Sequence, residues 1–190
     1  MHHVGRIVRL QVQVAPLKRG VTPHRWYDPS RIRPVDRLTV GDDGVLGHDG
    51  DLVLVDVHHR RHPQSRHRRP ASGLSLGFTS HYTWMRDRFG THLADGAAGE
   101  NVLVETDRRL GPEDLAGGLV IHGGATARRV LGGIEVAEPC VEFSRFAAPG
   151  HATGVEPLPQ LRGGVRGFYA VPEAGPWPVM PGEDLWVGVP

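Results

Sequence analysis

Cys140 is the only cysteine in the chain, and its neighbours define a distinctive local environment. Gly132-Gly133 predicts a tight turn, and Ile134 and Val136 predict a strand that starts after it. Pro139 has no N–H to donate to a sheet, so it should end that strand and leave Cys140 just beyond it. A single thiol at the rim of a β-structure is either a buried small hydrophobe or a soft ligand or nucleophile. These residues alone leave both interpretations open.

A second unusual residue is Lys18, the only lysine in a chain that otherwise uses arginine. It lies in the loop 15–20, directly after the segment 5–14. That segment alternates apolar and polar residues and predicts a half-buried strand with an irregular register near Val8. A lysine at a strand end is suited to act as a point charge for an anion. The alternative is a chance lysine in an arginine-rich sequence.

The tract 58–69 contains five arginines and four histidines. Such a run of charge is usually a solvated loop. A phosphate or nucleic-acid patch is the alternative, although the tract has no aromatic residues that could stack on bases. Its histidines show neither a fixed ligand spacing nor an acidic partner, which argues against a metal site there.

Composition favours one soluble β-rich domain spanning residues 1–190. Hydrophobic residues make up 39% of the 190 positions, and 26 glycines and 16 prolines indicate many turns. A formal charge of +1 gives no general case for nucleic acid as a partner. One cysteine cannot form an internal disulfide, and no window approaches the roughly 20 apolar residues of a membrane span. We therefore expect a cytoplasmic protein with no leader peptide and no membrane partner.

The order of patterns along the chain predicts a β-barrel of roughly eight strands with one or two short helices. Short strands are expected at 37–40, 45–46, 73–78, 99–105, 117–121, 128–131, 166–171 and 185–187, and a mostly buried one at 51–57. Thr79 or Ser80 is expected to cap a helix over 81–89 that ends at Gly90. The segment 147–164 is expected to be a loop rich in glycine and proline.

Three separated segments resemble the MOSC domain family, named for the C-terminal domain of molybdenum cofactor sulfurase. Gly99-Glu-Asn-Val-Leu-Val resembles a Gly-Glu-Asn motif that opens a strand, and Glu135-Val-Ala-Glu-Pro-Cys140 is similar to the strand that ends in the family's cysteine. The third segment, Arg166-Gly-Phe-Tyr-Ala-Val with the later Pro181-Gly-Glu-Asp184, is similar to the closing pattern of the family. Residues 5–20 more weakly resemble the first strand and the lysine loop of the group that includes the mitochondrial amidoxime reducing component. The sequence departs from the family just before the cysteine: the family often has an arginine there, whereas this chain has Glu138.

The resemblance implies a molybdenum cofactor held by this chain. Cys140 would be the metal ligand, since molybdenum is soft enough to take a thiolate, and Lys18 would contact the phosphate of the pterin. Arg166 is either a second phosphate ligand or a surface residue. Asn101 would bind a pterin edge or stabilise a turn. Glu100 would either serve the site or be a solvent-facing or backbone-capping carboxylate. Tyr169 is expected to belong to the core.

Three functions from different classes follow from these residues. The first is a molybdenum oxidoreductase that reduces N-hydroxylated small molecules and takes electrons from a donor protein, because nothing in the chain resembles a flavin, haem or iron–sulfur site. The second is a sulfur carrier that holds a persulfide on Cys140 and exchanges it with a sulfur donor or acceptor. The third is a non-catalytic barrel that binds a polyanion through the tract 58–69.

Overall fold

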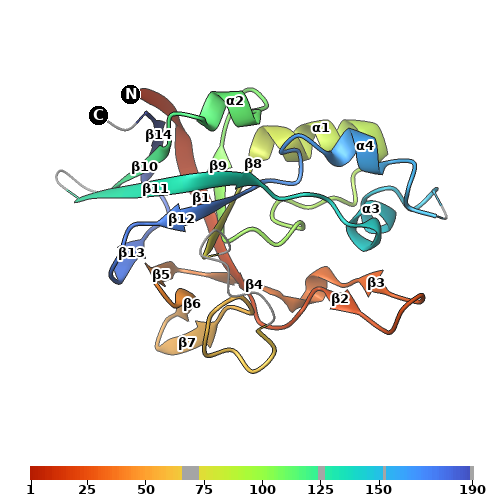
Figure 1. Cartoon of the computed structure of the whole chain (residues 1–190), viewed down its shortest axis with the longest axis horizontal. Coiled ribbons are helices and arrows are strands. Elements are labelled where there is room, and N and C mark those ends of the chain that lie inside the picture. The colour runs from red at the N-terminus through yellow and green to blue at the C-terminus, as the bar shows by residue number, and fades with distance from the viewer. Residues whose placement is uncertain (66–72, 124–126, 152, 189–190) are drawn as a thin grey trace.

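Seven strands close into a barrel in the part of the chain that the structure describes. The structure is a computed structural model that describes residues 1–65, 73–123, 127–151 and 153–188. Around the barrel the order is β14 (Asp184–Val187), β10 (Leu119–Gly123), β11 (Ala127–Val136), β12 (Phe168–Pro172), β8 (Leu74–Phe78), β9 (Val102–Glu105) and β1 (His2–Gln13). β1 then pairs with β14 and closes the ring (Figure 1). Only β8 and β9 run parallel among these pairs. The mainly β barrel predicted from the sequence is confirmed.

Smaller elements surround the barrel. β4 (Ile32–Val35) pairs with the end of β1, and a second sheet has the order β13 (Trp177–Val179), β5 (Arg37–Gly41), β6 (Gly44–Asp49) and β7 (Leu52–Val55). A ribbon of two short strands consists of β2 (Lys18–Arg19) and β3 (Trp26–Tyr27). The helices are η1 (Pro29–Arg31, a 3-10 turn), α1 (Thr79–Phe89), α2 (Pro112–Leu115), α3 (Val141–Ala147) and α4 (Leu158–Leu161).

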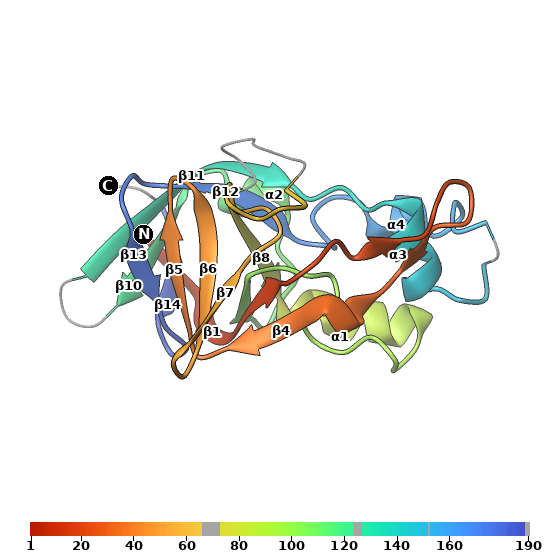
Figure 2. The same cartoon turned by 90° about the horizontal axis from the view of Figure 1, so that it is seen from below.

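The helices α1, α3 and α4 gather with the β2–β3 ribbon at one end of the molecule, away from both chain termini (Figures 1 and 2). None of the helices in the described ranges combines the length and the apolar character needed to cross a bilayer.

β1 connects most of the architecture because it pairs with three other strands, β4, β9 and β14. Its register with β9 shifts between Ile7 and Arg9, which confirms the irregularity predicted near Val8. Gly5 is required where β9 approaches closely, since a Cβ there would lie 1.8 Å from the carbonyl oxygen of Glu105. The strand therefore delivers its C-terminal end, and Lys18 beyond it, to a fixed place beside the barrel.

β11 corrects one expectation about the segment before Cys140. Gly132-Gly133 does not form a turn between two strands; β11 continues through both residues. The register with β12 shifts between Gly132 and Glu135, and Gly133 adopts a φ of 51°. The two glycines thus form a bulge, because glycine tolerates the left-handed conformation that a bulge can require.

Three further expectations on local structure are wrong. Helix α1 begins without a side-chain cap after Phe78, because the Thr79 hydroxyl is used by the loop beyond β9. β7 leaves Leu52 and Val53 exposed, since it is the last strand of the second sheet among the described residues. Four short α-helices are present in the described ranges instead of one or two, and α4 lies within the expected loop 147–164. Helices α2, α3 and α4, with 4, 7 and 4 residues, are too short for an apolar period to be recognised.

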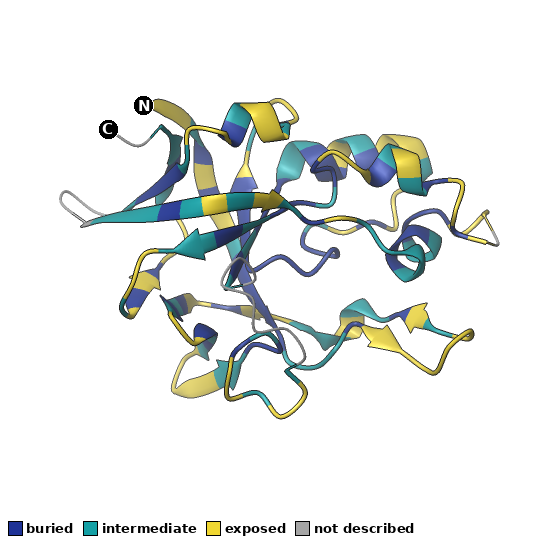
Figure 3. Cartoon of the chain, viewed as in Figure 1, coloured by how far each residue is buried: buried dark blue, intermediate teal, exposed yellow. Residues whose placement is uncertain are grey.

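Two hydrophobic clusters hold the molecule together. Figure 3 shows where the buried residues lie along the chain. The first fills the barrel and extends under the second sheet, and it includes Ile7, Leu76 and Phe168. The second lies between α1, α3 and the β2–β3 ribbon, with Tyr82 and Phe143 among its largest members. The second cluster fixes the helices relative to the barrel, so it positions every segment at that end of the molecule.

The Asn101 side chain links β8, β1 and the segment after β7 through hydrogen bonds. Its Oδ1 accepts from the backbone N–H and the hydroxyl of Ser75, at 3.2 and 2.9 Å. Its Nδ2 donates to the carbonyl oxygen of Gln11 at 3.2 Å and to Oδ2 of Asp56 at 3.1 Å. The side chain is therefore fully engaged within the protein, which supports the structural interpretation of this residue.

We predict that Asn101→Ala lowers the free energy of unfolding by about 2–4 kcal/mol, because it leaves several buried polar groups unpaired. Urea denaturation followed by circular dichroism measures the change. Gln64→Ala, which removes an exposed amide from a surface turn, is the control and should stay close to wild type. Equal stability of the Asn101 variant and the control would contradict the assigned role.

Candidate functional site

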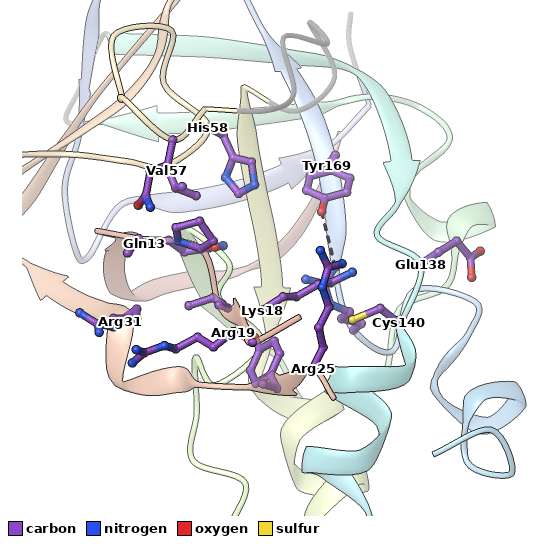
Figure 4. Close-up of a pocket in the computed structure, with 17 residues that line it drawn as sticks. Gln13, Lys18, Arg19, Arg25, Arg31, Val57, His58, Glu138, Cys140 and Tyr169 are labelled. Atoms are coloured by element: carbon purple, nitrogen blue, oxygen red, sulfur yellow. Dashed lines mark hydrogen bonds between the residues drawn. The ribbon is translucent and has the colours of Figure 1, made fainter. Parts of the chain in front are cut away.

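A cavity of about 680 Å³ opens beside the barrel at the end where the helices and the β2–β3 ribbon gather (Figure 4). Its walls come from five stretches of chain: 13–20 after β1, 25–31 around β3 and η1, 57–64, 138–140 after β11, and 166–169 at the start of β12. Cys140, Lys18 and Arg166 all line this cavity. The structure thus brings together three of the five residues selected from the sequence. Asn101 and Glu100 are not among its lining residues.

The thiol is held in the wall by the helix that follows it. Cys140 is the N-cap of α3, with an extended backbone, and its Sγ accepts the N–H of Phe143 at 3.4 Å. Phe143 and Ala147 are fully buried in the second hydrophobic cluster, so α3 cannot shift without opening that cluster. Cys140 itself is partly exposed. The thiol is therefore accessible from the cavity rather than sealed in the core.

Among the described residues, five cationic side chains line the same cavity, and we call them the pocket cations: Lys18, Arg19, Arg25, Arg31 and Arg166. Asp28 pairs with two of them, lying 3.1 Å from Arg19 and 3.7 Å from Arg31. Glu138 is the one carboxylate among the described lining residues, and Figure 4 shows its side chain turned away from the centre. Cations exceed anions at this surface, so the cavity favours a negatively charged ligand.

Lys18 reaches across the cavity to the helix that carries the thiol. Its Nζ lies 3.7 Å from Oε2 of Glu142, two residues after Cys140. Burial alone would raise the pKa of Glu142, but its own backbone N–H, Lys18 and the nearby thiol hold that pKa below its usual value. Glu142 is therefore ionised at neutral pH and directs the ammonium group toward the thiol side of the cavity.

Arg166 is half-buried at the back of the cavity. Its guanidinium makes long hydrogen bonds to the hydroxyl of Tyr169 (3.5 Å) and the carbonyl oxygen of Ala98 (3.4 Å), and it lies 5.7 Å from the ring centre of Phe143. Its Nε is buried and has no hydrogen-bond partner among the described residues. This arrangement corrects the expectation that Tyr169 belongs to the core: it is partly exposed and lines the cavity. The side chain of Tyr169 points outward from β12, opposite to its buried neighbours Phe168 and Ala170.

Glu100 lies deep in the protein rather than at its surface. The hydroxyl of Tyr82 donates to Oε2 of Glu100 at 2.9 Å, while Oε1 has no partner within the described part of the chain. Burial raises the pKa of this carboxyl from 4.5 to about 7. Glu100 is therefore not solvent-facing, and it is not among the residues that line the cavity.

A histidine in the cavity wall was not selected from the sequence. His58 lines the cavity, and its Nδ1 lies 3.0 Å from Oδ1 of the buried Asp56. The available signal was the Asp-x-His spacing directly after a strand, but the run of histidines and arginines that follows obscured it. The remaining tract is only partly described: residues 66–69 lie outside the described ranges.

Comparisons with known proteins identify the fold alone. No family model and no curated protein matches the sequence. Among solved structures, YuaD from Bacillus subtilis superimposes with a TM-score of 0.54 at 15% identity, covering 94% of this chain and 96% of YuaD. YiiM from Geobacillus stearothermophilus gives a TM-score of 0.50 at 17% identity, covering 98% of this chain and 74% of YiiM. A structure titled only as a hypothetical protein gives 0.59 at 15% identity, with 98% and 70% covered. The chain therefore shares its barrel fold with these proteins.

The raised pKa of Glu100 predicts a pH-dependent stability. In the unfolded chain the carboxyl ionises near 4.5, whereas in the folded protein it keeps its proton to about 7. The protonated carboxyl of Glu100 therefore contributes to the free energy of unfolding. That contribution is fully present below pH 4.5 and is lost as the pH rises to about 7, with a total change of at most about 3 kcal/mol.

Glu100→Gln removes the ionisation and keeps an acceptor for Tyr82. We therefore expect the free energy of unfolding of the wild type, relative to this variant, to fall between pH 5 and pH 8. Chemical denaturation at both pH values measures the difference. Glu105→Gln, at an exposed position on β9, should retain the wild-type pH dependence. A difference between wild type and Glu100→Gln that does not change with pH would refute the assignment.

Proposed function

We propose that this protein is a MOSC-type protein that binds the molybdenum cofactor and reduces N-hydroxylated small molecules, with Cys140 as the metal ligand. The observation that carries the proposal is that the only thiol and the only lysine of the chain, far apart in sequence, line one cavity. The barrel fold shared with YuaD and YiiM supports the family assignment, as do the three sequence segments that resemble MOSC proteins.

The residues of the cavity fit the chemistry of this cofactor. A thiolate is a suitable ligand for a soft metal, and the pocket cations suit a phosphate. The buried Nε of Arg166, which lacks a partner in the described structure, is a donor available to a bound anion. No group of three or more His, Cys, Asp or Glu side chains in the described ranges could hold a metal ion between them, so the metal would rely on one protein sulfur and on the pterin. When bound, the cofactor supplies a metal centre that exchanges electrons.

The protein's own residues then have separable tasks. Cys140 anchors the metal from the rigid start of α3. Lys18 binds the phosphate as a point charge. To do so, its ammonium group must leave Glu142 or contact Glu142 and the phosphate together. Arg166 orients the anion from the back of the cavity, where Tyr169 and the carbonyl oxygen of Ala98 hold its guanidinium. Electrons must come from a separate donor protein, in line with the absence of any flavin, haem or iron–sulfur motif in the sequence.

A sulfur carrier is the second candidate, because the partly exposed thiol of Cys140 is accessible to a partner through the cavity. In that case Cys140 would hold a persulfide, and the pocket cations would stabilise the charge on its terminal sulfur. Mass spectrometry of the intact protein distinguishes the two candidates, since only the carrier shows an additional sulfur on Cys140.

Molybdenum content tests the proposal. The protein is expressed in a host that makes the cofactor, and the metal is measured by mass spectrometry with inductively coupled plasma. We expect stoichiometric molybdenum in the wild type and almost none in Cys140→Ala. Lys18→Ala should weaken retention about ten- to a hundredfold, because it removes a charge-assisted contact worth about 1.5–3 kcal/mol.

The matched control is Arg60→Ala, which removes an exposed cation paired with Asp43 at 3.5 Å outside the cavity. It should retain wild-type molybdenum. Equally negligible metal in the wild type and Cys140→Ala would exclude the oxidoreductase, and an added sulfur in the same wild-type sample would then favour the carrier.

A further inference from the structure

Asp56 and His58 form a hydrogen-bonded pair that extends from the protein interior into the cavity. Asp56 is almost completely buried, and His58 retains about a quarter of its side-chain exposure, 26%. The imidazole Nδ1 and the backbone N–H of His58 both lie at hydrogen-bond distance from Oδ1 of Asp56, at 3.0 and 2.9 Å. Oδ2 of Asp56 accepts the backbone N–H of Gln13 at 2.8 Å and the amide of Asn101 at 3.1 Å.

This geometry fixes the protonation pattern of the imidazole ring. A carboxylate only accepts hydrogen bonds, so Nδ1 of His58 must carry the proton. Burial by itself would raise the pKa of Asp56, but the hydrogen bonds from His58 and from Gln13 bring it below its usual value and keep the carboxylate ionised. The second ring nitrogen, Nε2, is then the atom that exchanges protons with whatever occupies the cavity.

His58 and Cys140 face the same cavity from different walls, as Figure 4 shows. The other titratable or charged groups that line it are the pocket cations, Glu138 and Tyr169. Glu138 turns away from the centre, Tyr169 is engaged by Arg166, and Asp56 is the carboxylate in contact with His58. Among the described lining residues His58 supplies the one imidazole, the side-chain type that most often serves as a general acid or base.

We propose that His58, held in a single tautomer by Asp56, is the proton donor to the substrate in this cavity. This inference rests on the proposed function. Reduction of an N-hydroxylated compound breaks its N–O bond and consumes two electrons from the donor protein and two protons. His58 in its doubly protonated, imidazolium form gives the proton on Nε2 to the departing oxygen, which leaves as water, and a proton from solvent completes the amine or amidine nitrogen. Solvent then reprotonates His58, and Asp56 acts as a positioning residue throughout.

The first test needs no cofactor. Nitrogen-15 NMR of the metal-free protein, with histidine signals assigned from single variants, should show neutral His58 with its proton on Nδ1. In Asp56→Asn the acceptor becomes an amide, and the Nε2–H tautomer should appear. If that variant fails to fold, the NMR spectrum of the wild type still tests the inference, because a neutral wild-type His58 with its proton on Nε2 overturns it.

The second test uses protein loaded with cofactor, benzamidoxime as the N-hydroxylated probe and reduced methyl viologen as the electron source. His58→Gln should lower kcat about a hundredfold while its molybdenum content stays at the wild-type level. The wild-type kcat should fall as the pH rises through the His58 titration seen by NMR, and His58→Gln should lack that dependence. His62→Gln is the matched control, because His62 lies in the same segment but not among the lining residues, and its kcat and pH profile should match wild type.

The outcomes separate the two hypotheses. An active wild type with an equally active His58→Gln overturns the role of His58 and leaves the proposed function standing. A wild type that carries molybdenum but reduces no probe overturns the proposed reductase activity, and the proton-donor role with it. A loss of activity in His58→Gln that follows a loss of molybdenum also counts against proton donation, because His58 would then be needed for cofactor binding.

Discussion

The structure depends on the hydrogen bonds that replace the lost water around one buried carboxylate, that of Asp56. Burying a charged group costs several kcal/mol unless hydrogen bonds replace its water shell. Asp56 receives four such bonds, from the backbone and ring of His58, the backbone of Gln13 and the amide of Asn101. These donors come from the end of β1, from the start of β9 and from the segment after β7, so their geometry fixes three parts of the chain relative to one another. The cavity wall at residues 13 and 57–58 follows directly from that constraint.

The barrel was predictable from the sequence because its strands obey simple rules. In β1 the apolar and polar residues alternate strongly enough to specify both the strand and its irregularity near Val8. Gly90 ends helix α1 as expected, since glycine accepts a φ of 121°. Lys18, Arg166 and Cys140 line one cavity, and Lys18 and Cys140 already stood out by chemical type as the single lysine and the single thiol.

Other features depend on contacts that no local pattern encodes. Arg19, Arg25 and Arg31 are arginines among many, and only the pairing of β2 with β3 brings them to the cavity. Glu100 and Asn101 are adjacent in sequence and both buried, yet they contact different partners: Glu100 accepts from the hydroxyl of Tyr82, and Asn101 donates to Asp56. The bulge in β11 was missed because a glycine pair predicts a turn and a bulge equally well.

The uniqueness of Lys18 and Cys140 has a practical consequence. An amine-selective reagent has one lysine side chain to modify, besides the chain terminus, and a thiol-selective reagent has one cysteine. Both groups border the same cavity, with Lys18 about half exposed. A fluorophore and a quencher attached to these two side chains would therefore report the separation of two walls of this cavity, in a protein that needs no engineered attachment points.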